Sequence, residues 1–126
     1  MSRLPQAETD RRGTALVVDD DPIVRRFISS VLALRGFEVL EAPDAAQALV
    51  AFQASGSAVD LVVTDFRMPG MNGCELARML LVARPSLTVL LVSGSHPESA
   101  ESLPFLQKPF APAGLLDALR RILPDR

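Results

Sequence analysis

The feature that most restricts the fold is a repeated alternation between short apolar runs and segments with helical apolar spacing. Five short runs rich in apolar and β-branched residues lie at residues 15–18, 37–40, 59–64, 87–92 and 103–106. The other segments carry apolar side chains three and four residues apart, which is typical of one face of a helix. Strand and helix in alternation predict βαβ units, and therefore a parallel sheet with helices on both faces. The expected fold class is α/β, a doubly wound parallel sheet of five strands.

Several residues mark where the helices begin and end. Asp21 and Pro22 are typical of the cap and first residue of a helix, and Gly36 of the position after its end. Asn72 and Glu75 have the spacing of a capping box, and Pro112 is expected to open the last helix. The segment 94–102 reads GSHPESAES and is polar or small throughout, so we expect only one or two helical turns there.

Composition excludes several classes of protein. The chain has 126 residues, 48% hydrophobic and 22% charged, which suits one globular domain over residues 13–126 with a flexible tail at 1–12. A single cysteine, Cys74, and a single histidine, His96, exclude an internal disulfide and the usual zinc sites. The net charge of −2 without a basic stripe argues against direct binding of nucleic acid. No apolar run approaches the ~20 residues of a membrane span, and the polar N-terminus is no secretory signal, so we expect a cytoplasmic protein without membrane insertion.

Residues capable of chemistry follow four of the five expected strands. They are Asp19, Asp20 and Asp21 after the first, Asp65 after the third, Ser93 after the fourth and Lys108 after the fifth. If strands one, three, four and five are neighbours, these side chains meet at the carboxyl edge of the sheet, where ligands bind in such folds. Clustered carboxylates favour Mg²⁺, and a carboxylate can also attack phosphorus to form an acyl phosphate. A divalent ion and a lysine neutralise the charge of a transferring phosphoryl group. The set therefore predicts an aspartyl-phosphate site.

Some of these residues also have a purely structural interpretation. Asp21 is better explained as a helix cap, Ser93 could cap a turn, and Phe105 on the fifth strand could be a core aromatic. Lys108 is the only lysine among thirteen basic residues. The other twelve basic residues are arginine. Because lysine is a compact point charge and arginine a planar fork, a lysine at 108 favours a site that needs one ammonium group.

The motifs LVVDDDP, DLVVTDFRMPGMNG, LLVSG and PFLQKPF, in this order, resemble those of response-regulator receiver domains. The resemblance covers residues 13 to about 123. It implies a flavodoxin-like sheet of order 2-1-3-4-5 with five helices. It also implies that Asp65 accepts a phosphoryl group from a phosphohistidine on a histidine kinase or histidine phosphotransfer protein. Such a domain is a signalling module, not a turnover enzyme, although it catalyses its own phosphorylation and dephosphorylation.

The resemblance assigns a role to each matching position. Asp20 and Asp65 would bind Mg²⁺ through their side chains, Arg67 through its backbone carbonyl and Asp19 mostly through water. Lys108 would contact the phosphoryl group, with a cis bond to Pro109. Ser93 would be the switch hydroxyl and Phe105 the switch aromatic. The surface expected to change on phosphorylation is the fifth strand with the last helix, including Phe105, Phe110 and Arg120.

The sequence departs from the family pattern in a few places. Serine at 93 and phenylalanine at 105 replace the commoner threonine and tyrosine, and the short segment 94–102 replaces much of the usual fourth helix. The SG and PFLQKPF motifs resemble receivers of hybrid histidine kinases. We expect no output domain in this chain, and the sequence names no downstream target.

Two other functions remain open at this stage. Asp19-x-Asp21 loosely resembles the nucleophile motif of haloacid-dehalogenase-type phosphatases, although a second acidic motif near the end of the chain is lacking. The domain could also act as an interaction module that is never phosphorylated.

Overall fold

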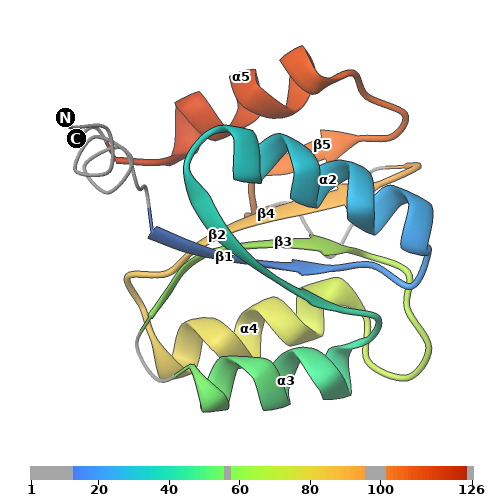
Figure 1. The fold of residues 1–126 in the computed structure, drawn as a ribbon. Helices are drawn as coiled ribbons and strands as arrows, with labels where there is room; N and C mark the ends of the chain where they lie inside the picture. Colours follow the sequence, from blue (N-terminus) through green and yellow to red (C-terminus); the bar gives the residue numbers. More distant parts are fainter. Residues whose placement is uncertain (1–12, 56–57, 96–101, 125–126) are drawn as a thin grey trace, which may run out of the picture.

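The computed structural model describes residues 13–55, 58–95 and 102–124. Strands and helices alternate along this part of the chain (Figure 1). The strands are β1 (Gly13–Val18), β2 (Phe37–Ala42), β3 (Val59–Asp65), β4 (Thr88–Ser93) and β5 (Phe105–Gln107). The helices are α2 (Pro22–Leu34), α3 (Ala45–Ala54), α4 (Gly73–Ala83) and α5 (Pro112–Ile122).

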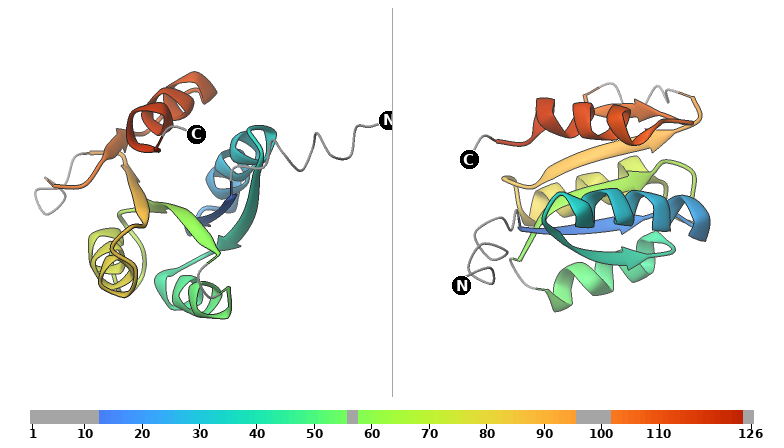
Figure 2. Two further views of the ribbon diagram at one scale, coloured as in Figure 1. Left: turned by 90° about the vertical axis from the view of Figure 1, so that its left-hand side faces the viewer. Right: turned by 45° about the horizontal axis from the view of Figure 1, so that its top comes forward.

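The strands form one parallel sheet in the order β2-β1-β3-β4-β5. Helices α2 and α5 cover one face of this sheet, and α3 and α4 cover the other (Figures 1 and 2). The expected fold class and strand order are therefore confirmed.

Alternate residues of the strands point into two separate cores. Ala15 and Val17 of β1 pack with α2 and α5, whereas Leu16 and Val18 pack with α3 and α4. All four side chains are buried, which explains why the central strands are apolar along most of their length. The polar residues of these strands are therefore confined to their ends.

The expected helix ends are confirmed. The Asp21 side chain accepts a hydrogen bond from the backbone N–H of Ile23 at the start of α2, and Pro22 is the first helical residue. Asn72 and Glu75 form both hydrogen bonds of a capping box at the start of α4. Gly36 has φ of 99°, the left-handed conformation that ends a helix and favours glycine.

One expectation about the C-terminal half needs correction, and another is not tested. The fifth strand begins at Phe105 and not at residue 103, since Pro104 has no N–H to donate to a sheet ladder. The described part of the chain contains four helices, and the fifth helix that the resemblance implies stays a prediction. Residues 94, 95 and 102 are not helical, and the rest of the expected short helix, 96–101, lies outside the described residues, as does the expected tail at 1–12.

No helix within the described ranges is both long enough and apolar enough to span a bilayer.

Candidate functional site

The carboxyl ends of β1, β3, β4 and β5 lie along one edge of the sheet. Strand pairing places Val18 beside Thr64, Asp65 beside Val92 and Ser93 beside Gln107. The residues that end these strands or directly follow them are therefore brought together, although they are far apart in the sequence. This is the edge at which the polar residues were expected to meet.

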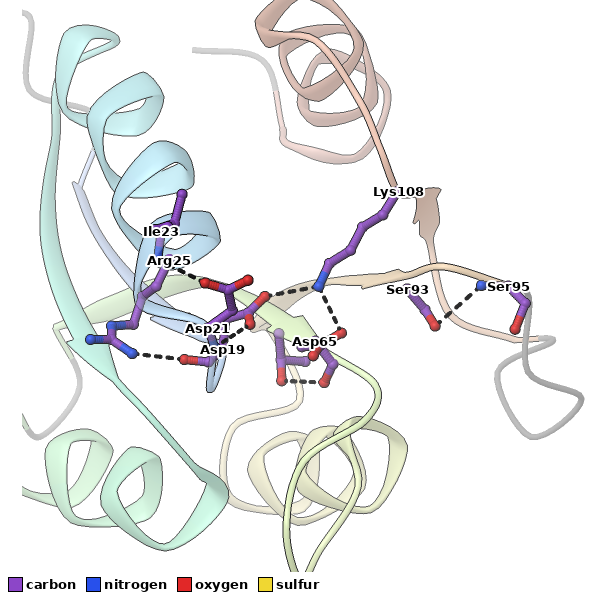
Figure 3. A network of polar contacts seen from close by, with 9 residues as sticks. Asp19, Asp21, Ile23, Arg25, Asp65, Ser93, Ser95 and Lys108 are labelled. Atoms are coloured by element: carbon purple, nitrogen blue, oxygen red, sulfur yellow. Dashed lines mark hydrogen bonds and ion pairs between the residues drawn. The ribbon is translucent and has the colours of Figure 1, made fainter.

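Lys108 joins two of the carboxylates (Figure 3). Its Nζ lies 3.1 Å from Oδ2 of Asp19 and 3.2 Å from Oδ1 of Asp65. Asp19 is fully buried and Asp65 is 6% exposed. Buried carboxylates are costly unless they are paired, so the single lysine offsets much of the charge that the sheet edge concentrates.

Asp20 completes a group of three acids. One oxygen from each of Asp19, Asp20 and Asp65 lies within 4.8 Å of the others. Asp20 is exposed, whereas the other two are buried, so the group opens toward solvent on the side of Asp20. Several carboxylate oxygens without nitrogen or sulfur are the donor set that Mg²⁺ prefers, and the residues present therefore fit this ion.

Burial and neighbouring charges shift the pKa values of Asp65 and Lys108. Burial raises the pKa of Asp65 above its ordinary 3.8, and the neighbouring charge of Asp19 raises it further, while Lys108 partly opposes both. Burial alone would lower the pKa of Lys108, but its hydrogen bonds and charge interactions with Asp19 and Asp65 raise it above 10.5. Lys108 is therefore positively charged at neutral pH, and it lies beside Asp65, whose ionised form is disfavoured.

Ser93 and Lys108 come from neighbouring strand ends that are hydrogen bonded. The backbone N–H of Lys108 donates to the carbonyl of Ser93 at 2.7 Å. The Ser93 side chain is buried, and its hydroxyl accepts a long 3.5 Å hydrogen bond from the backbone N–H of Ser95. The bond between Lys108 and Pro109 is cis, as the resemblance implies.

The other two expected site residues lie on β5 and in the loop after β3. Phe105 is half-buried on β5, beside Leu91, and packs against Leu91 and Cys74. Arg67 is exposed in the loop after β3. Their roles as switch aromatic and carbonyl ligand stay predictions.

The sequence and fold agree with known signalling proteins. The family model described as response regulator receiver domain matches residues 15–120. The chain belongs to this family. The transcriptional regulatory protein DctD of Pseudomonas aeruginosa, a regulator of C4-dicarboxylate transport, is 36% identical over 97% of this chain and 28% of that protein. The receiver therefore spans about a quarter of the length of the first curated relatives that it matches.

Solved receiver structures share the whole architecture. The receiver domain of the hybrid histidine kinase CckA is 30% identical with a TM-score of 0.75, over 86% of this chain and 97% of that one. The response regulator TrrA of Thermotoga maritima, in complex with Mg²⁺ and BeF, is 25% identical with a TM-score of 0.76, over 88% and 99% of the two chains. The receiver interpretation of the motifs is confirmed.

Three residues near the site were missed by sequence reasoning. Arg25 donates to the carbonyl of Asp19, Thr64 donates to the carbonyl of Asp65, and the backbone of Gly73 packs directly against that same carbonyl. Arg25 could have been noticed, since a cation near a helix N-terminus opposes the helix dipole and so invites another explanation. Thr64 gave no sign of its role, because threonine is common in strands.

Proposed function

We propose that Asp65 is the phosphoacceptor of this receiver domain. The observation that carries the proposal is the ion pair of Lys108 with two buried carboxylates. Only Asp65 of these two ends a central strand, where it pairs with Val92, the residue before Ser93. A carboxylate oxygen of Asp65 would attack the phosphorus of a phosphohistidine. The P–N bond breaks, its electron pair returns to the imidazole ring, and an acyl phosphate forms on Asp65.

The neighbouring residues have distinct tasks in this scheme. Asp19, Asp20 and Asp65, with the backbone carbonyl of Arg67, would hold Mg²⁺. When bound, this ion would neutralise charge on the phosphoryl group and on the carboxylates. Lys108 would leave part of its ion pairing with Asp65 to contact the phosphoryl group. The Ser93 hydroxyl, whose present hydrogen bond is long, would turn toward the same group.

Phosphorylation would act by a population shift, because the new acceptor oxygens favour one arrangement of the strand ends. Phe105 connects this change to β5 and α5, which form the proposed output surface. The proposed donor is a histidine kinase or a histidine phosphotransfer protein. The cytoplasmic location expected from the sequence stays a prediction.

Neither alternative function gains support from the site. In the phosphatase alternative Asp21 is one of the reacting acids, but here its side chain caps α2. The interaction module that is never phosphorylated would have no need for Lys108 between two buried acids.

Labelling with acetyl phosphate tests the assignment of Asp65. Wild-type protein with Mg²⁺ should gain one phosphoryl group, detected by intact mass, and Asp65→Asn should gain none. Asp60→Asn is the matched control, because Asp60 lies on the same strand and is exposed; it should label like the wild type. Labelling that persists in Asp65→Asn would refute the assignment.

A further inference from the structure

Every polar atom of Asp19 has a partner. Its backbone N–H donates to the carbonyl of Ala42 at 3.2 Å, and its Oδ1 accepts from the N–H of Asp21 at 2.9 Å. Its Oδ2 pairs with Lys108, and its carbonyl oxygen accepts from Nη1 of Arg25 at 2.9 Å. The contacts with Ala42 and Lys108 hold the residue and its carboxylate, and the contact with Asp21 closes a turn around Asp20. The contact with Arg25 holds the peptide that directly follows Asp19.

That peptide joins Asp19 to Asp20. Because a peptide unit is planar, the direction of its oxygen determines how the chain enters the next residue. Asp20 is exposed, and its carboxylate has no hydrogen bond to the described residues that would hold it independently. The backbone is therefore the main determinant of where this carboxylate lies relative to Asp65.

Arg25 is itself held in place. Its Nε donates to Oε1 of Glu41 at 2.9 Å, and the two side chains are 17% and 34% exposed. Glu41 lies on β2 directly beside Val17 of β1. The guanidinium group thus links α2, the end of β2 and the loop that follows β1 through two different nitrogens. Figure 3 shows the second of these contacts, from Arg25 to the carbonyl of Asp19. A lysine has a single nitrogen and does not reproduce this fork.

We propose that Arg25, anchored by Glu41, is a positioning residue that directs the Asp20 carboxylate toward the bound divalent cation. The proposal rests on the proposed function, since it requires the acidic group to bind Mg²⁺. Arg25 touches neither the metal nor the phosphoryl group in this scheme; it acts through the peptide between Asp19 and Asp20.

The affinity for Mg²⁺ distinguishes a positioning role of Arg25 from a purely electrostatic one. Removal of a partner that orients a metal ligand costs roughly 10-fold or more in affinity, so both Arg25→Lys and Arg25→Met should weaken Mg²⁺ binding by about 10-fold. A purely electrostatic role predicts tighter binding for Arg25→Met and no change for Arg25→Lys. Isothermal titration calorimetry suits the measurement, because the chain has no tryptophan or tyrosine.

Three further measurements complete the test. Glu41→Gln should weaken binding in the same direction, and its effect should not add fully to that of Arg25→Lys, because the two residues act as one unit. At saturating Mg²⁺, phosphorylation of Arg25→Lys by acetyl phosphate should recover the wild-type rate. Arg26→Lys, the exposed neighbour on α2, should bind Mg²⁺ like the wild type.

The outcomes distinguish this inference from the proposed function. Wild-type protein that neither binds Mg²⁺ nor labels on Asp65 would refute the proposed function. If the wild type does both, unchanged Mg²⁺ affinity in folded Arg25→Lys would refute the role of Arg25, even with a lower melting temperature. A labelling rate that stays low at saturating Mg²⁺ would also refute it.

Discussion

The surroundings of Asp65 disfavour the ionised form of its side chain. It is nearly buried beside Asp19, and Lys108 offsets only part of the resulting cost, so its pKa remains raised. A carboxylate in this condition gains from any group that brings positive charge to it. The same unfavourable charge also predicts how stability responds to substitution and to pH.

Asp65→Asn should therefore be more stable than the wild type at pH 7 without Mg²⁺, by roughly 1 kcal/mol, or about 4 °C in Tm for a domain of this size. The folded wild type binds the proton of Asp65 more tightly than the unfolded chain does. Its stability relative to the variant thus rises as pH falls, and the advantage of the variant should vanish below the ordinary carboxyl pKa of 3.8. Urea unfolding of both proteins in EDTA at several pH values measures this difference. An advantage that grows toward acid pH would contradict the assigned cause.

Gly94 directly follows Ser93 and leaves space at the edge of the site. A Cβ at this position meets nothing within 4 Å. Gly94→Thr should fold normally and hinder the approach of water to the acyl phosphate. We expect the phosphorylated half-life to lengthen about fivefold, which corresponds to ~1 kcal/mol in the barrier. Following the decay of the phosphorylated mass tests this, and an unchanged half-life would count against control by water access.

At the level of single residues, the sequence was informative where a reactive side chain lies at the end of an expected strand. Three acids and one lysine at expected strand ends were found because a parallel sheet brings its carboxyl ends together. Arg25 was not found, because its contacts depend on how β2 and α2 pack, and that geometry is not visible in local spacing.

Among the elements, α4 packs unusually close to the strand that carries Asp65. A Cβ on Gly73 would overlap with the carbonyl oxygen of Asp65 and approach the Leu91 side chain to 2.9 Å. The N–H of Gly73 also donates to the carbonyl of Phe66 at 2.8 Å, which fixes the helix at this distance. The first turn of α4 therefore supports the back of the site.

Gly73→Ala should destabilise the fold by roughly 1–3 kcal/mol, since backbone atoms do not move aside as flexible side chains do. Gly114→Ala is the matched control. It lies inside α5, where a Cβ meets only Phe110 at an ordinary 3.6 Å. It should stabilise the protein by about 0.5–1 kcal/mol through helix propensity. Chemical denaturation of both variants checks the two signs, and similar effects would refute the close-packing argument.

Helix ends were predictable because their capping residues act locally. Asp21, Asn72 and Glu75 form hydrogen bonds within three residues, so the sequence alone contains the interaction. The start of β5 was not predictable in the same way. The apolar residues at 103–106 form one run in the sequence, whereas Pro104 interrupts strand pairing. The segment at 94–102 is polar or small throughout and therefore has no apolar periodicity from which its conformation could be predicted.

Over the whole molecule, the two cores lie on opposite faces of the same strands. Leu32 of α2 packs on one face and Leu80 of α4 on the other, and both are fully buried. Shared strands couple the two cores, although none of the described side chains belongs to both.

Leu32→Ala and Leu80→Ala should each lower the free energy of unfolding by about 2–5 kcal/mol. Each variant should still unfold in one cooperative transition, because neither core can persist once the sheet is lost. Circular dichroism at 222 nm and calorimetry should give coincident transitions. Two separate transitions in either variant would contradict the coupling.

The layered architecture was predictable from alternation alone, whereas the strand order was not. Apolar runs show that both faces of the central strands are covered, but they carry no information on which strand is adjacent to which. The order came from the family resemblance, and the site depends on it, since Asp19, Asp65 and Lys108 meet only when β1, β3, β4 and β5 follow one another.

The solitary lysine has a consequence for covalent chemistry. With no other lysine in the chain, any acylation of a lysine side chain within these 126 residues must fall on the amine between Asp19 and Asp65. Such a modification would remove the ammonium and leave two buried acids without their counter-ion. Acylation of this chain and loss of the proposed contact with the phosphoryl group would therefore be one event.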